Sequence, residues 1–405
     1  IAPGVTDPEA KAAAVRMTRI ILPAQFFFFS GGLFMAVQFA KERFALPALA
    51  PLLYNVGIIL GGIVLGPRLG MEGFSWGVLA GAFAGNFVVQ YVGARRVGMR
   101  LYPVFKVGHP DLRRYVLLTL PLMVGLTMTF STEFFLRFFG SYLPGGNIAA
   151  LNYGLRVMLI VVGLFGQAVG VASYPFLARL AVEGKVHEMN KLLNKTLRYL
   201  SLVIPVAVLL IVLRNEVVGI LFERGRFDAD ATALTASVLP FLLAGSFAFA
   251  AQTVVVRGYY AMQNTIFPTV LGSLAVLLSI PIYVFGLRTM GVSGVALAIS
   301  FSSVFQVVLL YALWNKRTKN TGGRGVFSLY ARVIAMSLPL YILLEWFRFQ
   351  VTGIIGLSSL AGRLAVCFIT GVAFLGVLLM AGSALKVPEV SGLFAQLNKR
   401  RRQRT

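Results

Sequence analysis

The chain has 405 residues, of which 58% are hydrophobic and 13% charged, whereas soluble domains are about half apolar and about a quarter charged. Uncharged runs recur at the length of about 20 residues that a membrane-spanning helix needs, which excludes an ordinary soluble fold and predicts an all-α, polytopic transmembrane bundle. The formal net charge is +23, but the cations lie in short loops between apolar runs, so we expect membrane lipids and no nucleic acid as their partners.

Residues suited to catalysis or metal binding are scarce. The single cysteine, Cys367, lies in an apolar run, and His109 and His187 are far apart in the chain. These numbers exclude a disulfide and a multi-cysteine metal site. No Walker motif, pair of catalytic carboxylates or metal-ligand spacing occurs. We therefore expect no catalytic residue, no metal, no cofactor and no enzyme activity.

In chain order, the apolar runs predict about eleven membrane spans. Their approximate bounds are 20–39, 46–66, 74–92, 115–139, 148–176, 199–213, 231–256, 266–287, 292–313, 329–346 and 360–381.

Most Lys and Arg residues fall in one set of alternate loops, which the positive-inside rule places in the cytoplasm. The C-terminal segment 385–405 belongs to that set and is expected to be a basic cytoplasmic tail. Its spacing of apolar residues fits a short helix on an anionic membrane surface, and a disordered basic tail fits it almost as well. With eleven spans and a cytoplasmic C-terminus, Ile1 would begin outside, so we expect an odd number of helices upstream.

Within the expected spans, Glu133 and Arg137 are four residues apart on one helix and can pair with each other one turn apart. Intramembrane charges often line a cavity or couple transport to an ion. The alternative is a self-neutralising pair near the outer end of the helix.

Arg156 has no acidic residue within one helical turn on either side. A guanidinium group stays ionised and can grip phosphate oxygens with two hydrogen bonds, so an unpaired arginine in an apolar helix indicates an anionic ligand. We therefore expect Arg156 to bind the substrate. The alternative is that its side chain extends to the nearby outer interface.

Embedded amides form a second group of polar residues. Asn55 and Gln90 could line a cavity or take part in coupling, although most such residues hydrogen-bond between helices.

Several strings resemble the bacterial lipid II flippase family (MurJ, also called MviN), which belongs to the multidrug/oligosaccharidyl-lipid/polysaccharide exporter superfamily. The likeness keeps its order from Ile1 to about Lys319, and the strings are fairly specific only when taken together. They are RFALPALAPLLYN at 43–55, LNYGLR at 151–156, GLFG at 163–166, YPFLARL at 174–180, LFERGRFD at 221–228 and RGYYAMQN at 257–264.

The resemblance implies a fold of fourteen helices, with two six-helix lobes around a central cavity and two further helices that form a lipid-facing groove. The eleven predicted spans fit this pattern if about three N-terminal helices lie upstream. Residues 1–96 would then be the remainder of the N-terminal lobe, 101–319 the C-terminal lobe, 327–384 the additional pair, and 385–405 the tail.

The resemblance also concerns site residues. The family binds the pyrophosphate of lipid II with arginines in its first two helices and one in its eighth, and Arg156 matches the last. Leu159 stands where some members have an acid one turn after that arginine, and Leu136 where many have aspartate. These departures put cation coupling through that helix in doubt, although Glu133 could substitute.

The function implied is the flipping of lipid II from the inner to the outer leaflet of the bacterial cytoplasmic (inner) membrane by alternating access, in support of peptidoglycan synthesis and cell shape. Membrane potential or a monovalent cation could drive it. Cell-wall synthesis proteins could be partners. Two alternatives are an exporter of other polyprenyl-diphosphate-linked saccharides and a drug antiporter of the same superfamily. A non-transporting scaffold for cell-wall assembly is a third.

Overall fold

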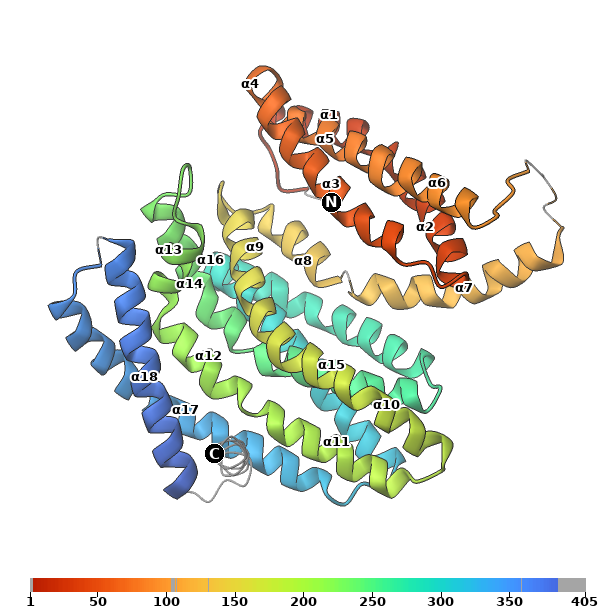
Figure 1. Ribbon diagram of the computed structural model, residues 1–405. Helices are drawn as coiled ribbons and strands as arrows, with labels where there is room; N and C mark the ends of the chain where they lie inside the picture. The colour runs from red at the N-terminus through yellow and green to blue at the C-terminus, as the bar shows by residue number, and fades with distance from the viewer. Residues whose placement is uncertain (1–2, 103–105, 107, 130, 358, 385–405) are drawn as a thin grey trace, which may run out of the picture. The chain divides into compact units, whose positions relative to one another are not determined.

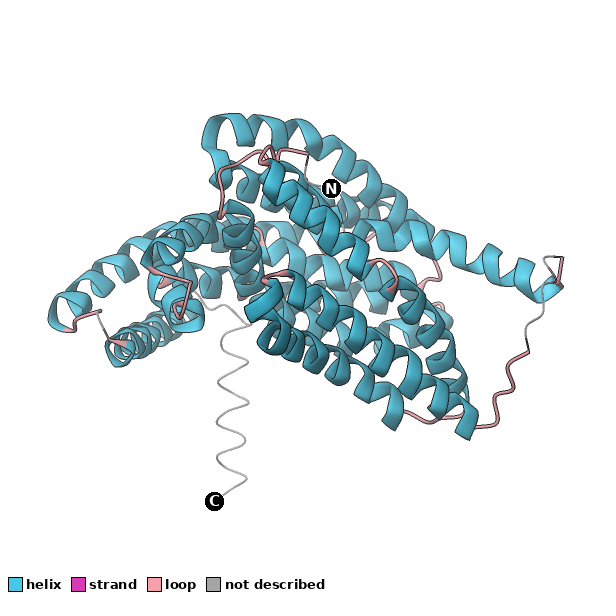
Figure 2. Ribbon diagram, turned by 90° about the horizontal axis from the view of Figure 1, so that it is seen from above, coloured by secondary structure: helices cyan, strands magenta, loops and turns pink. Residues whose placement is uncertain are grey.

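The computed structural model describes residues 3–102, 106, 108–129, 131–357 and 359–384. Within these ranges the regular structure is entirely helical, with no strand (Figures 1 and 2). A helix satisfies its own backbone hydrogen bonds, as apolar segments in lipid require. The predicted all-α class is therefore confirmed. The predicted basic tail, 385–405, lies outside the described residues.

The described part of the chain contains eight helices that are long and apolar enough to cross a membrane. The number rises to nine if α14 (Ala229–Leu243) and α15 (Ser246–Ala261), which are bent by 46° at their junction, form one span. The predicted number of about eleven is not confirmed.

Two predicted spans fall within a single long helix, α16 (Ile266–Arg317). Gly291 has a φ of 57° inside this helix, in the left-handed region that glycine adopts readily. The helix is therefore kinked between the predicted spans 266–287 and 292–313.

The chain divides into two compact units. Unit 2 comprises Val5–Arg114, and unit 1 comprises Tyr115–Thr405 with Ile1–Gly4. The finer division expected from the sequence, which separates 327–384 from 101–319, stays a prediction. The helices of unit 2 are α1 (Pro8–Ile21), α2 (Ala24–Ala40), α3 (Ala45–Leu60), α4 (Gly66–Leu69), α5 (Glu72–Gly81) and α6 (Val89–Arg96), with the π-helical turns η1 (Gly61–Leu65) and η2 (Ala82–Val88).

Glycines allow two helices of unit 2 to approach closely. A Cβ atom on Gly61, where α3 passes into η1, would lie 2.5 Å from the Cα atom of Gly77 in α5. A Cβ atom on Gly57, one turn earlier, would lie 2.6 Å from the Cα atom of Gly81. Small residues at such contacts let helix backbones pack by van der Waals attraction where the hydrophobic effect is weak.

Unit 1 is built around one apolar core. Leu151, Met158, Leu239, Leu242 and Trp314, from three different helices, are almost completely buried there. α7 (Pro110–Thr129) crosses the boundary between the units. Besides α14, α15 and α16, the helices of unit 1 are α8 (Ser131–Gly140), α9 (Asn147–Val161), α10 (Ala168–Val182), α11 (Val186–Leu200), α12 (Val203–Val212), α13 (Arg214–Phe222), α17 (Gly323–Ile354) and α18 (Leu360–Ala384), with the π-helical turn η3 (Val162–Gln167).

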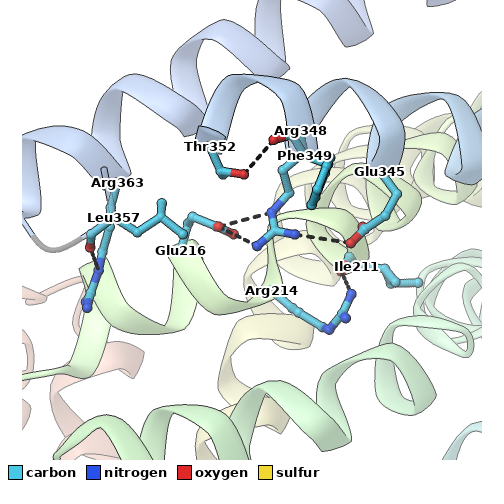
Figure 3. A network of polar contacts seen from close by, with 9 residues as sticks. All are labelled: Ile211, Arg214, Glu216, Glu345, Arg348, Phe349, Thr352, Leu357 and Arg363. Carbon is cyan, nitrogen blue, oxygen red and sulfur yellow. Dashed lines mark hydrogen bonds and ion pairs between the residues drawn. The ribbon is translucent and has the colours of Figure 1, made fainter. Parts of the chain in front are cut away.

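A network of ion pairs joins the two C-terminal helices to the rest of unit 1, and Figure 3 shows the part of it around Arg348. Arg348 in α17 donates from Nε and Nη2 to Glu216 Oε1 in α13, at 3.0 and 2.7 Å, and from Nη1 to Glu345 Oε1 at 3.1 Å. Arg363 in α18 donates to Glu223, just beyond α13, at 2.7 Å. The bonds to Glu216 and Glu223 connect residues more than 130 positions apart, so they hold α17 and α18 against α13.

Candidate functional site

A polar cavity of about 430 Å³ lies inside unit 1. Its walls come from α8, α9, η3, α15 and α16. Polar side chains contribute much of its lining, in contrast to the apolar core around it. The polar residues are Thr132, Glu133, Gln167, Gln252, Thr253, Arg257, Tyr260, Ser279, Tyr283, Ser302, Ser303 and Gln306.

Arg257 is the one cation among the described residues that line this cavity. Its Nη2 donates to Gln167 Oε1 at 3.0 Å. Its Nη1 is buried and finds no acceptor in the described parts of the chain. A Cβ atom on Gly170 would overlap Nη1, so this glycine makes room for the guanidinium group.

The apolar run predicted a span that ends at residue 256, just before Arg257, and the structure differs there. α15 continues to Ala261, so Arg257 lies on the last turns of a helix. The sequence itself indicated that the helix continues to Arg257, because Thr253 and Arg257 are four residues apart with no glycine or proline between them.

Glu133 lines the cavity, and it pairs with Arg137 at 3.4 Å. Both side chains are 52% exposed, and residues four apart on an exposed helix face interact only weakly. The pair expected from the sequence is therefore present. Arg137 is not among the described residues that line the cavity.

Arg156 lies on the exposed side of α9, between Leu155 and Leu159, which do line the cavity. The described residues offer it neither a hydrogen bond nor an ion pair. It does not itself line the cavity of unit 1. Its role as a substrate contact stays a prediction.

Asn55 and Gln90 belong to unit 2, and the structure does not bring them together with the cavity of unit 1. Gln90 is completely buried and donates to the carbonyl oxygens of Leu46 and Gly85, at 3.0 and 3.1 Å. Its own side-chain oxygen accepts from Gln38 at 3.1 Å. The bonds with Leu46 and Gln38 join different helices, as embedded amides commonly do. Asn55 is exposed on α3.

The two leucines that depart from the family pattern have different surroundings. Leu136 is completely buried in the core of unit 1. Phe139, on the same helix, stacks on Tyr283 with ring centroids 4.9 Å apart. Leu159 is 45% exposed and lines the cavity.

Metal-binding clusters were not expected. Among the described residues, no group of three or more His, Cys, Asp or Glu side chains could hold a metal ion.

Glu223, the acid of the ion-pair network that pairs with Arg363, lies outside the helices that could span a membrane. Arg363 donates a hydrogen bond to Glu223 and holds the pKa of this carboxyl below its usual range, and a hydrogen bond from Thr232 acts in the same direction. Burial opposes this shift. Glu223 therefore keeps its charge and its bond to α18 at neutral pH.

Sequence and structure comparisons agree on one family. The pattern of the family described as "Lipid II flippase MurJ" matches residues 1–361. A Burkholderia cenocepacia relative, "Lipid II flippase MurJ", is 27% identical over 349 residues, which cover 84% of this chain and 67% of that protein. A Rhizobium tropici relative, "Probable lipid II flippase MurJ", is 26% identical over 336 residues, which cover 78% of this chain and 60% of that protein.

One solved structure, "Lipid II flippase MurJ, inward closed conformation", superimposes with a TM-score of 0.71 at 21% identity. The match covers 93% of this chain and 76% of that one, and it shows a common fold. The chain spans about three-fifths to two-thirds of the length of the two relatives named above. Because the family pattern extends over 361 of the 405 residues, the chain belongs to the lipid II flippase MurJ family, a family of membrane transporters rather than enzymes.

Proposed function

We propose that this protein moves lipid II from the inner to the outer leaflet of the bacterial cytoplasmic membrane by alternating access. The observation that carries the proposal is the family match over residues 1–361. The relatives are named for lipid II rather than for other saccharide lipids or drugs, so the comparisons do not favour the alternative exporters. Peptidoglycan precursors and membrane lipids are then its ligands, and cell-wall synthesis proteins are candidate partners.

The physical problem for such a transporter is that a polar, charged headgroup must cross hydrocarbon, where unpaired polar groups are costly. The polar cavity of unit 1 supplies hydrogen-bonding groups within an apolar bundle. A separate groove of about 240 Å³, formed by α11, α15, α16 and α17, is lined almost wholly by apolar side chains and suits a polyprenyl tail. Tyr311 and Tyr330 are among the few lining residues with a polar atom.

In this proposal Arg156 holds the diphosphate. Its guanidinium group is ionised and exposed, and no acid among the described residues neutralises it. Arginine binds phosphate oxygens with paired hydrogen bonds, and each charge-assisted bond is stronger than a neutral one.

The driving force in this proposal is the membrane potential or a monovalent cation. An inside-negative potential does work of about 2.3 kcal/mol per elementary charge per 100 mV. That work favours outward movement of an anionic headgroup and inward return of a cationic empty site. We also place the C-terminus in the cytoplasm, because the basic loops and tail fall on one side.

The test is depletion and rescue in a bacterium whose own lipid II flippase is under inducible control. The protein, expressed from its complete native gene, should restore exposure of lipid II to a headgroup-cleaving enzyme added outside the cells. A second strain that lacks its O-antigen flippase serves as the specificity control and should not be rescued. Failure to expose lipid II, with the protein present in the membrane, would refute the proposal.

A further inference from the structure

The cavity of unit 1 holds hydrogen-bonding groups that the protein itself leaves unused. The side chains of Gln252, Ser302 and Gln306 line it and make no hydrogen bond to other described residues. Ser303 also lines it, is 4% exposed, and has a buried hydroxyl without a partner in the described structure. Buried polar groups in proteins are nearly always paired, so the Ser303 hydroxyl points to a ligand or to water in the cavity, and the three other side chains offer further hydrogen-bonding groups beside it.

The charged residues of the cavity help to decide between a ligand and water. Glu133, the one acid among the described lining residues, already has Arg137 as its partner at 3.4 Å. Arg257 has only the neutral amide oxygen of Gln167 as a side-chain partner. No described side chain that lines the cavity forms an ion pair with it.

A water molecule can pair with a hydroxyl or an amide, but it does not neutralise a guanidinium group in a low-dielectric bundle. An oxyanion does both, because its oxygens accept from guanidinium, hydroxyl and amide donors alike. Phosphate and carboxylate share this chemistry. The cavity volume of about 430 Å³ leaves room for the group that carries the oxyanion as well as for the oxyanion itself.

The geometry points to a second anion-binding position in this protein, in which Arg257, with Ser303 and Gln306, holds a phosphate or carboxylate group of the cargo. Arg257 and Gln306 lie on different helices, α15 and α16, so the site closes across the cavity. It is separate from Arg156, which does not line this cavity. This inference rests on the proposed function for the nature of the cargo.

Gln167 has a positioning role in this site. Its Oε1 atom accepts from Nη2 of Arg257 at 3.0 Å, and Gly170 makes room for Nη1. Both residues lie on the continuous helix formed by η3 and α10, so they fix the guanidinium group from one side while α16 offers hydroxyls from the other.

Binding can be measured without transport, by calorimetric titration of the purified full-length protein in detergent. Inorganic pyrophosphate and glutarate serve as the phosphate and carboxylate probes, and chloride concentration is held constant. At least one probe should bind. Arg257→Gln should weaken its Kd about tenfold or more, and Ser303→Ala should weaken it by a smaller factor. Arg257→Lys keeps the charge and should retain part of the affinity.

Arg288→Gln is the matched control, because Arg288 is an exposed arginine on α16 and does not line the cavity. Preferential binding of pyrophosphate assigns the site to the phosphates of the cargo, and preferential binding of glutarate assigns it to carboxylates. Absence of binding by both probes overturns the inference. So does an unchanged Kd in Arg257→Gln, Arg257→Lys and Ser303→Ala, each folded as judged by its thermal unfolding. Either result leaves the rescue experiment unaffected, because that experiment measures exposure of lipid II by the native protein.

Discussion

Replacement of Arg348 with methionine would leave Glu216 as a buried, uncompensated carboxylate. The Glu216 side chain is 1% exposed and the Arg348 side chain 14% exposed, so solvent screens this pair little. One oxygen of Glu216 already lacks a hydrogen-bond partner in the described structure, and the substitution would remove both donors to the other. Removal of one partner of a buried ion pair typically costs about 3–5 kcal/mol.

For a unit of this size we take a shift of the unfolding midpoint of about 2 °C per kcal/mol, so Arg348→Met should lower the midpoint by about 6–10 °C. The chain has one cysteine, Cys367, on α18, and its side chain is partly buried beside the network. A dye that fluoresces on reaction with thiols therefore reports directly on the opening of this region during a thermal ramp in detergent.

A control variant and a double variant test whether the loss comes from the buried charge. Arg332→Met changes an exposed arginine on the same helix, whose hydrogen bonds within the described structure go to Ser328, and should shift the midpoint little. The double variant with Arg348→Met and Glu216→Gln removes the charge of the more deeply buried carboxylate as well and should recover part of the loss, because Glu216 is 1% exposed and Glu345 is 32% exposed. Equal midpoints for Arg348→Met and Arg332→Met would refute the view that the network holds α17 and α18 in place.

Three further predictions concern other parts of the structure. Gly61→Ala should force α3 and α5 apart and lower the unfolding midpoint, whereas Gly66→Ala, where a Cβ atom meets open space, should not. Gln90→Leu removes the hydrogen bonds that the Gln90 side chain makes with Leu46, Gly85 and Gln38 and should cost about 1–3 kcal/mol of unfolding free energy, measured by the same thermal ramp. The pKa of Glu223 is lowered by Arg363, so its stabilisation is complete above the unfolded pKa of about 4.3 and is lost as pH falls through the lower folded value. The stability difference between the native protein and Glu223→Gln should therefore be constant from pH 7 to about 5 and shrink below about 4.

The apolar runs were sufficient to predict an all-α membrane protein, because hydropathy and the backbone's need for hydrogen bonds are local properties. The Glu133–Arg137 pair was predictable for the same reason, since four residues on a helix make neighbours. In the sequence, the kink at Gly291 appears only as a break between two apolar runs. The sequence did not show that helix α16 continues through this break.

Contacts between distant segments could not be predicted from local patterns. Glu216 and Arg348 are 132 residues apart, and nothing in their immediate sequence identifies them as partners. The predicted span stopped just before Arg257 because the apolar run ends there, although helix α15 continues past it. That Arg257, Ser303 and Gln306 line one cavity depends on how α8, α9, α15 and α16 pack around it.

The central claim is that a lipid-linked anion crosses the membrane through this protein with Arg156 as a phosphate contact. The most direct measurement is the initial rate at which lipid II appears in the outer leaflet of cells that carry the native gene, Arg156→Ala, Arg156→Lys or the control Arg288→Ala. Loss of a hydrogen-bonded charge typically costs about 1.5–3 kcal/mol, so Arg156→Ala should lower the rate about 10- to 100-fold, with a smaller loss for lysine and none for the control. A native rate in Arg156→Ala, at equal amounts of protein in the membrane, would contradict the account.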